Sequence, residues 1–214
     1  MSAKTQPAEP TGQTMQEPPR SAAWRWGRRI SDWVDPLKVI IFVSLTFGLH
    51  HAWKGLGWAA LAILFAGAVP MLYIVYARSG GRWSERHLTD RVKRMTVLPV
   101  ICASAAAGVV LEMATSAPAS MVALTAAMCA TITAVWPVTR WYKISVHAAV
   151  TSGAFTMLAI EYSWWWLAGL LLVPVISWAR VQVREHTIGQ VVSGTALGML
   201  VAGGVYVLVT RIAG

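Results

Sequence analysis

Charged residues are scarce in this sequence. They make up only 13% of the 214 residues, whereas a soluble domain normally carries about 25%. Hydrophobic residues make up 56% and are gathered in long runs. Such runs belong to helices that face lipid rather than to one large soluble core. The composition therefore excludes an ordinary soluble domain and predicts a protein embedded in a membrane.

Cysteine is also scarce. The two cysteines, Cys102 and Cys129, each lie within an apolar run. In that setting a thiol serves as a packing residue, and a disulfide framework is not supported. The sequence has no zinc-type cysteine spacing. We therefore expect neither a disulfide scaffold nor a metal bound by cysteine.

Acidic residues are outnumbered by basic ones, 9 against 18, which gives a net charge of +9. An excess of cations can indicate nucleic-acid binding, but these cations form no separate soluble module. They stand mostly at the ends of apolar runs, where positive residues fix membrane orientation and meet anionic headgroups. We therefore expect the phospholipid bilayer as a partner and no nucleic acid.

The N-terminal part of the chain differs from the rest. Residues 1–23 are polar and are expected to form a disordered tail. A signal peptide is not expected, because the first long apolar run begins only near Leu37 and lacks a cleavage pattern. Residues 24–36 combine tryptophan with arginine, which is typical of a segment at the membrane interface. The remaining residues, 37–214, are expected to form one transmembrane domain.

Seven apolar segments follow, and a membrane-spanning helix needs about 20 residues. Continuous runs of this kind lack the alternation of a β-barrel, and lipid admits no other sheet. The first segment is short, so we predict an all-α membrane bundle of six to seven transmembrane helices. The segments are 38–53, 57–77, 96–114, 117–137, 144–160, 163–179 and 187–210.

Small residues recur within these segments. Gly194 and Gly198 are separated by four positions in the last segment. This spacing lets a neighbouring helix approach closely. Glu112 and Glu161 lie near the ends of their segments and are expected to be interfacial carboxylates, which argues against a transporter.

The distribution of cations predicts the orientation. With seven spans, the tail and the loops at 78–95, 138–143 and 180–186 share one side. That side holds every cation except Lys54 and Arg211. Because positive residues concentrate inside, we expect these loops in the cytoplasm and the protein in the plasma membrane. If 38–53 does not span, the tail changes sides while the three loops stay together.

Two segments begin with residues suited to bind an anion. Ser145 and His147 open the fifth segment, where the free N–H groups of a helix N-terminus favour an anion. Arg180 and His186 bracket the loop before the seventh segment, and Gln190 lies one helical turn beyond His186. The Gln190 amide oxygen can accept the proton of one imidazole nitrogen and leave the other free as a nucleophile.

A phosphoryl group would need cations around its oxygens, because negative charge spreads over them during transfer. Arginine suits this role because its planar guanidinium binds phosphate with two parallel hydrogen bonds. The candidate phosphate-binding cations are Arg86, Arg91, Lys93, Arg94 and Arg180.

These residues resemble the motifs of the type 2 phosphatidic acid phosphatase family, which shares its core with vanadium-dependent haloperoxidases. The second motif, Pro-Ser-Gly-His, is similar to the stretch from Ile144 to His147. The third motif, Ser-Arg, five residues, His, three residues, Asp, is similar to the stretch from Ala179 to Gln190. The resemblance covers roughly residues 80–200. It implies a helical membrane fold of that family.

The resemblance also implies roles for the residues. His186 would be the nucleophile that becomes phosphorylated, and His147 the general acid that protonates the leaving oxygen. Ser145 and Arg180 would bind the phosphoryl group. The resemblance implies no metal and no cofactor.

The first family motif, Lys, six residues, Arg-Pro, is degraded in this chain. His87 stands seven residues before Arg94, and Met95 replaces the proline. Arg86 could pair with Lys93, or with Arg94 after one insertion, and both frames remain open.

The other two motifs also differ from the family pattern. Val146 replaces glycine, which restricts the backbone beside Ser145. Gln190 replaces aspartate, so it can orient the imidazole of His186 but brings no negative charge. We expect slower turnover than in a relative with aspartate at this position.

The sequence therefore predicts an enzyme that hydrolyses the phosphate or diphosphate of a membrane lipid through a phosphohistidine. A polyprenyl phosphate or diphosphate is favoured, with phosphatidate and phosphatidylglycerol phosphate as the other candidates. The alternative is a catalytically inactive relative that binds or carries anionic lipids.

Overall fold

The computed structural model describes residues 21–79 and 90–213, with the side chains of residues 78 and 90–94 left out. All regular elements in these two ranges are helices, which confirms the all-α prediction. Five stretches have the length and apolar composition needed to cross a membrane. They are Ala52–Ala77, Met95–Ala114, Ala119–Thr139, Trp164–Gln182 and Ile188–Ala213.

Each predicted apolar segment is helical, although several are built from consecutive pieces. In order they are α2 (Pro36–His50); α3 (Ala52–Ile63), η1 (Leu64–Ala68) and α4 (Val69–Ser79); α5 (Asp90–Ala114); α6 (Ala119–Thr139); α7 (Val146–Glu161); η2 (Trp164–Leu171) and α8 (Leu172–Gln182); and α9 (Ile188–Leu197), η3 (Gly198–Ala202) and α10 (Gly203–Ala213). Helices α2 and α7 have 15 and 16 residues, which is shorter than a full span of about 20. The total of six to seven spans therefore stays a prediction.

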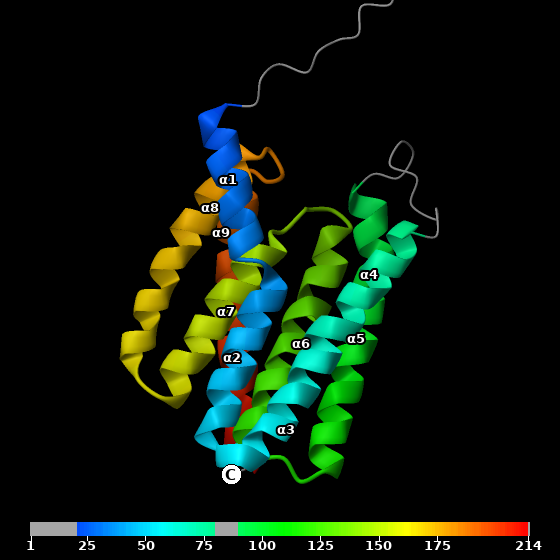
Figure 1. Cartoon of the computed structure of the whole chain (residues 1–214), viewed down its shortest axis with the longest axis vertical. Helices are drawn as coiled ribbons and strands as arrows, with labels where there is room; N and C mark the ends of the chain where they lie inside the picture. The colour runs from blue at the N-terminus through cyan, green and yellow to red at the C-terminus, as the bar shows by residue number, and fades with distance from the viewer. Residues whose placement is uncertain (1–20, 80–89, 214) are drawn as a thin grey trace, which may run out of the picture.

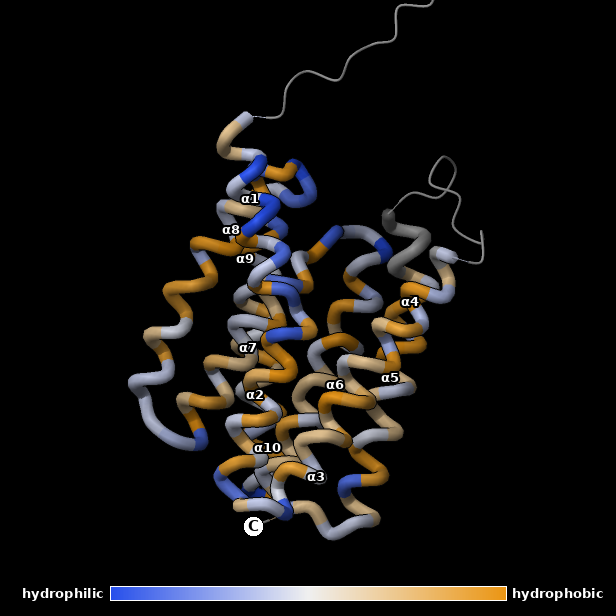
Figure 2. The backbone as a smooth tube through the Cα atoms, viewed as in Figure 1, coloured by the Kyte–Doolittle hydropathy of each residue, from blue (hydrophilic) through white to orange (hydrophobic). Residues whose placement is uncertain are grey.

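The segments run alternately up and down along the axis of the bundle (Figure 1). The α6–α7 connection (140–145), the α8–α9 turn (183–187) and the flanking ends of α4 and α5 lie at one end, which is hereafter the basic end. The C-terminus lies at the opposite end with the α2–α3 junction. Hydrophilic residues gather at the basic end and hydrophobic residues along the helices (Figure 2). These connections therefore lie at one end of the bundle, as predicted, and their location on the cytoplasmic side of a membrane stays a prediction.

The segment before the bundle is a helix, α1 (Ala22–Trp33), which begins within the predicted tail. The hydroxyl of Ser21 caps it by accepting the N–H of Trp24 at 3.2 Å. Helix α1 packs on α8 at Gly27, where a Cβ atom would lie 3.0 Å from the carbonyl oxygen of Ala179. Its location at the membrane interface stays a prediction.

The α7 helix and the α9–η3 segment approach closely through small residues, as predicted. A Cβ atom at Gly194 would lie 2.5 Å from the carbonyl oxygen of Ser145, and one at Gly198 would collide with that of Ala149. The Ser152 hydroxyl donates to the carbonyl oxygen of Thr195 at 3.0 Å across the same interface. The contact holds the N-terminal ends of α7 and α9 together at the basic end.

The prediction for Glu112 is wrong. Its side chain is fully buried, and its Oε1 accepts the Thr125 hydroxyl of α6 at 2.9 Å. The position of Glu112 in the sequence predicts how near it lies to the end of its helix. It does not predict the face of α5 from which the side chain projects. Glu161 is partly exposed and accepts the hydroxyl of Tyr206.

We predict that Gly198→Ala destabilises the protein, because the added methyl group collides with the backbone of α7. Overpacking of this kind costs about 1–3 kcal/mol. Gly204→Ala is the matched control, because a Cβ atom at Gly204 meets nothing within 4 Å. Thermal unfolding in detergent should show a lower melting temperature for Gly198→Ala only; equal melting temperatures would contradict the packing described.

Candidate functional site

A cavity of about 760 Å³ opens among α2, α4, α5, α6 and α7. At the basic end it is lined by charged and polar side chains, and toward the middle of the bundle by apolar ones. The charged lining residues are Asp35, Lys143, Arg180 and Glu185, and the polar ones include His147 and Thr131. The apolar lining includes Ile40, Val97, Ile101, Met128 and Met157. The cavity can therefore hold an amphiphile with an anionic head and an apolar chain.

The bulges η1 and η3 border this cavity. Both are single π-helical turns, which frequently mark functional sites. In η1 the Phe65 carbonyl accepts the hydroxyl of Ser104 of α5 at 2.6 Å, which ties the two segments together. Ala66 and Gly67 of η1 and Ala202 of η3 present little side chain to the cavity they line. Small residues in these bulges leave room between the helices.

The α8–α9 turn places Glu185 and His186 next to Arg180. Arg184 has a φ of 56°, in the left-handed region that costs a residue with a Cβ atom about 1–2 kcal/mol. This turn directs the N–H groups of Glu185 and His186 to the carbonyl oxygen of Arg180, at 3.1 and 3.3 Å. The chain thus folds back so that Arg180, Glu185 and His186 are neighbours.

The guanidinium of Arg180 is almost buried, with 7% of the residue exposed. Its Nη2 forms an ion pair with Glu185, and its Nη1 donates to the Ser31 hydroxyl of α1 at 3.4 Å. Its Nε has no hydrogen-bond partner within the described residues. A buried cation needs such partners, because an unpaired charge is costly away from water.

His186 has the partner that the sequence predicts. Its Nδ1 lies 3.2 Å from the amide oxygen of Gln190, and the residue is 5% exposed. The same amide oxygen accepts the N–H of Thr187 at 3.2 Å, and the Thr187 hydroxyl accepts the N–H of Gln190. Gln190 therefore both orients the imidazole and completes a capping box at the start of α9.

Ser145 and His147 lie on the other side of this cluster. The N–H of Ser145 donates to the carbonyl oxygen of Gln190 at 3.1 Å, which joins α7 to α9. The Ser145 hydroxyl is fully buried and has no hydrogen-bond partner among the residues that the structure covers. His147 lines the cavity with Arg180, while Ser145 and His186 are not part of its lining. Backbone contacts thus bring together four of the predicted site residues, namely Ser145, Arg180, His186 and Gln190.

The predicted cations of the 78–95 loop cannot be placed in this site. Arg86 lies outside the described residues. Arg91, Lys93 and Arg94 belong to the first turns of α5 at the basic end, but their side chains are also outside the description.

Three residues of the cavity mouth were not identified from the sequence, namely Asp35, Lys143 and Glu185. Lys143 lines the cavity and donates from Nζ to the carbonyl oxygen of Glu185 at 2.9 Å. Its position directly before the stretch from Ile144 to His147 was the available signal. Glu185 was recognisable as a carboxylate in an otherwise basic turn, directly before His186.

Comparison with protein-family models, curated proteins and solved structures gives no significant match to this chain. The helical fold and the five long apolar helices within residues 21–79 and 90–213 define the class, a multi-pass helical membrane protein.

We predict that Gln190→Ala lowers the melting temperature, because it removes the capping-box side chain and the partner of His186. Loss of a cap costs about 1 kcal/mol. Thr187→Ala should cost a similar amount, whereas Thr187→Ser keeps the capping hydroxyl and serves as the control. Thermal unfolding of the purified variants measures this, and a stable Gln190→Ala protein would exclude the capping role.

Proposed function

We propose that this protein is an integral-membrane lipid phosphatase related to the type 2 phosphatidic acid phosphatases. The observation that supports it is a cavity with an apolar interior and a polar mouth, in which Lys143 and Arg180 lie beside Asp35 and Glu185. Arg180 and Lys143 can bind phosphate oxygens at the basic end. The apolar lining between the helices can receive the chain of the same lipid. The phosphate and the apolar chain of one lipid could thus both bind while the lipid stays in the bilayer.

The favoured substrate is a polyprenyl phosphate or diphosphate, with phosphatidate and phosphatidylglycerol phosphate as alternatives. Its phosphate would enter the polar mouth beside His147. A single long apolar chain suits a cavity of about 760 Å³ enclosed among several helices. By the positive-inside rule, the basic end would face the cytoplasm. The protein would span the plasma membrane six or seven times.

In the proposed reaction, Nε2 of His186 attacks phosphorus while the bond from phosphorus to the lipid oxygen breaks. His147 gives a proton to that leaving oxygen. Arg180 and Lys143 neutralise the charge on the phosphoryl oxygens, and Gln190 holds the proton on Nδ1 of His186. Water then attacks the phosphohistidine, His147 takes the proton from the water, and inorganic phosphate leaves with His186 restored.

A second candidate function is binding or transport of anionic lipids without turnover. It is favoured by the position of His186 behind the cavity lining and by the neutral Gln190 as its partner. Such a protein would use the same cavity and the same cations.

We predict that the purified protein releases phosphate from at least one member of a lipid-phosphate panel in detergent micelles. His186→Ala should abolish release, because no phosphohistidine can form, and His147→Ala should lower it about 100-fold or more. His50→Ala is the matched control, since His50 is exposed at the opposite end of the bundle. Binding of the panel without release of phosphate would favour the carrier.

We also predict that Gln190→Glu raises kcat. Glutamate has the same length as glutamine, so its carboxylate can keep the contact with Nδ1 of His186 and add negative charge. That charge makes the other ring nitrogen a stronger nucleophile. Steady-state kinetics on the preferred lipid phosphate measures the change, with the melting temperature as a folding control. An unchanged or lower kcat in a stably folded variant would argue against this role.

A further inference from the structure

The guanidinium of Arg180 already holds an anion. Its Nη2 is paired with the carboxylate of Glu185, and both residues line the polar mouth of the cavity. The two side chains differ in exposure, since 8% of the Arg180 side chain and 37% of the Glu185 side chain is accessible. The carboxylate therefore occupies Nη2 of the guanidinium, one of the groups that could otherwise bind a phosphoryl oxygen.

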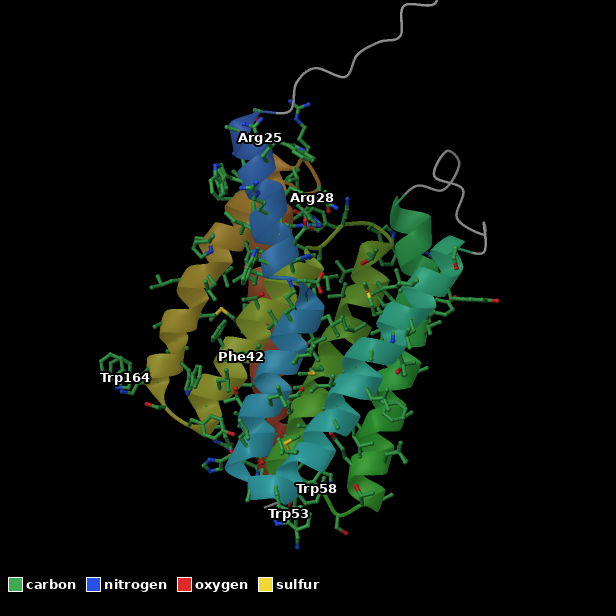
Figure 3. The ribbon with its side chains drawn as sticks, viewed as in Figure 1. Arg25, Arg28, Phe42, Trp53, Trp58 and Trp164 are labelled. Carbon is green, nitrogen blue, oxygen red and sulfur yellow. The ribbon has the colours of Figure 1, made fainter. Side chains whose placement is uncertain are left out.

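Glu185 also has a second cation within reach. Its Oε1 lies 3.6 Å from Nη1 of Arg28 on α1, and Arg28 is in turn 3.4 Å from Asp32. Figure 3 shows Arg28 at the basic end, beside the α8–α9 turn. Lys143 donates from Nζ to the backbone carbonyl oxygen of Glu185 and thereby supports the turn. The carboxylate can thus leave Arg180 and remain paired with Arg28 while the turn stays in place.

We propose that Glu185 occupies the phosphate position of Arg180 in the substrate-free protein and is displaced toward Arg28 by the headgroup phosphate. This inference rests on the proposed function, because it assumes that Arg180 binds the phosphoryl group. Glu185 directly precedes His186, which lies behind the lining of the same cavity.

This exchange makes Glu185 an internal competitor of every anionic ligand. Displacement lowers the apparent affinity of every such ligand by one common factor, as in any site whose competent state is a minor one. A phosphomonoester or diphosphate carries more charge than a phosphodiester headgroup, so it has the higher intrinsic affinity and more readily displaces the carboxylate.

The test is the affinity of the full-length protein in detergent for inorganic phosphate, measured by titration calorimetry. Glu185→Gln removes the competing charge and should bind phosphate roughly tenfold more tightly than the wild type, which corresponds to about 1.4 kcal/mol. Glu161→Gln is the matched control, because it removes an equal charge at the C-terminal end of α7, which lies opposite the basic end that holds Arg180 and Arg28. Its affinity should equal that of the wild type. Addition of Arg180→Gln to Glu185→Gln should abolish binding.

Equal or weaker affinity of Glu185→Gln would overturn the proposal, as would an equal gain in Glu161→Gln. If Glu185→Gln does not fold, Glu185→Asp replaces it. Its shorter carboxylate reaches Arg180 less well, so its affinity must exceed that of the wild type. Turnover of the lipid-phosphate panel by the wild type is scored separately. If Glu185→Gln binds phosphate more tightly but the wild type shows no turnover, the displacement of Glu185 is supported and the proposed phosphatase activity is rejected. If the wild type turns over lipid phosphates but Glu185→Gln shows no gain in affinity, the activity is supported and the displacement is rejected.

Discussion

The close contact between α7 and the α9–η3 segment is the constraint on which the candidate site depends. The absence of side chains at Gly194 and Gly198 lets the carbonyl groups of Ser145 and Ala149 lie against the backbone of the neighbouring segment. Lipid offers backbone groups no hydrogen-bond partners, so close packing of small residues is a main source of helix association in membranes. Here it also joins Ser145 to the carbonyl oxygen of Gln190 and thereby sets two helix N-termini side by side.

A second constraint is the cost of a cation near the hydrophobic part of the bundle. Arg180 is nearly buried and is compensated by Glu185 and by the hydroxyl of Ser31. Because Ser31 and Arg28 belong to α1, this helix takes part in the electrostatics of the cavity mouth. A site that attracts phosphate must hold its cations at a tolerable cost when phosphate is absent. An internal carboxylate meets that need.

The cavity connects the polar cluster to the membrane interior. Lys143, Arg180 and His147 lie at the basic end, whereas Met128 and Met157 line the part that reaches between the helices. The bulge η1 contributes Gly67 and thereby keeps this space open next to α2. An amphiphilic ligand is therefore suited to the site by the architecture of the bundle as much as by the individual charges.

Hydropathy and charge act along the chain without reference to distant residues, so they were enough to predict the helical class, the apolar segments and the shared end of the basic connections. The spacing of four residues also predicted the contact between His186 and Gln190, although His186 lies before the start of α9 and meets Gln190 through the capping box rather than on one face of a helix. Only the tertiary structure decided that Glu112 is buried, that Lys143 faces the cavity and that Glu185 is paired with Arg180. These depend on which face of a helix meets its neighbour and on how a turn with a left-handed residue at Arg184 folds back, and local sequence does not specify either.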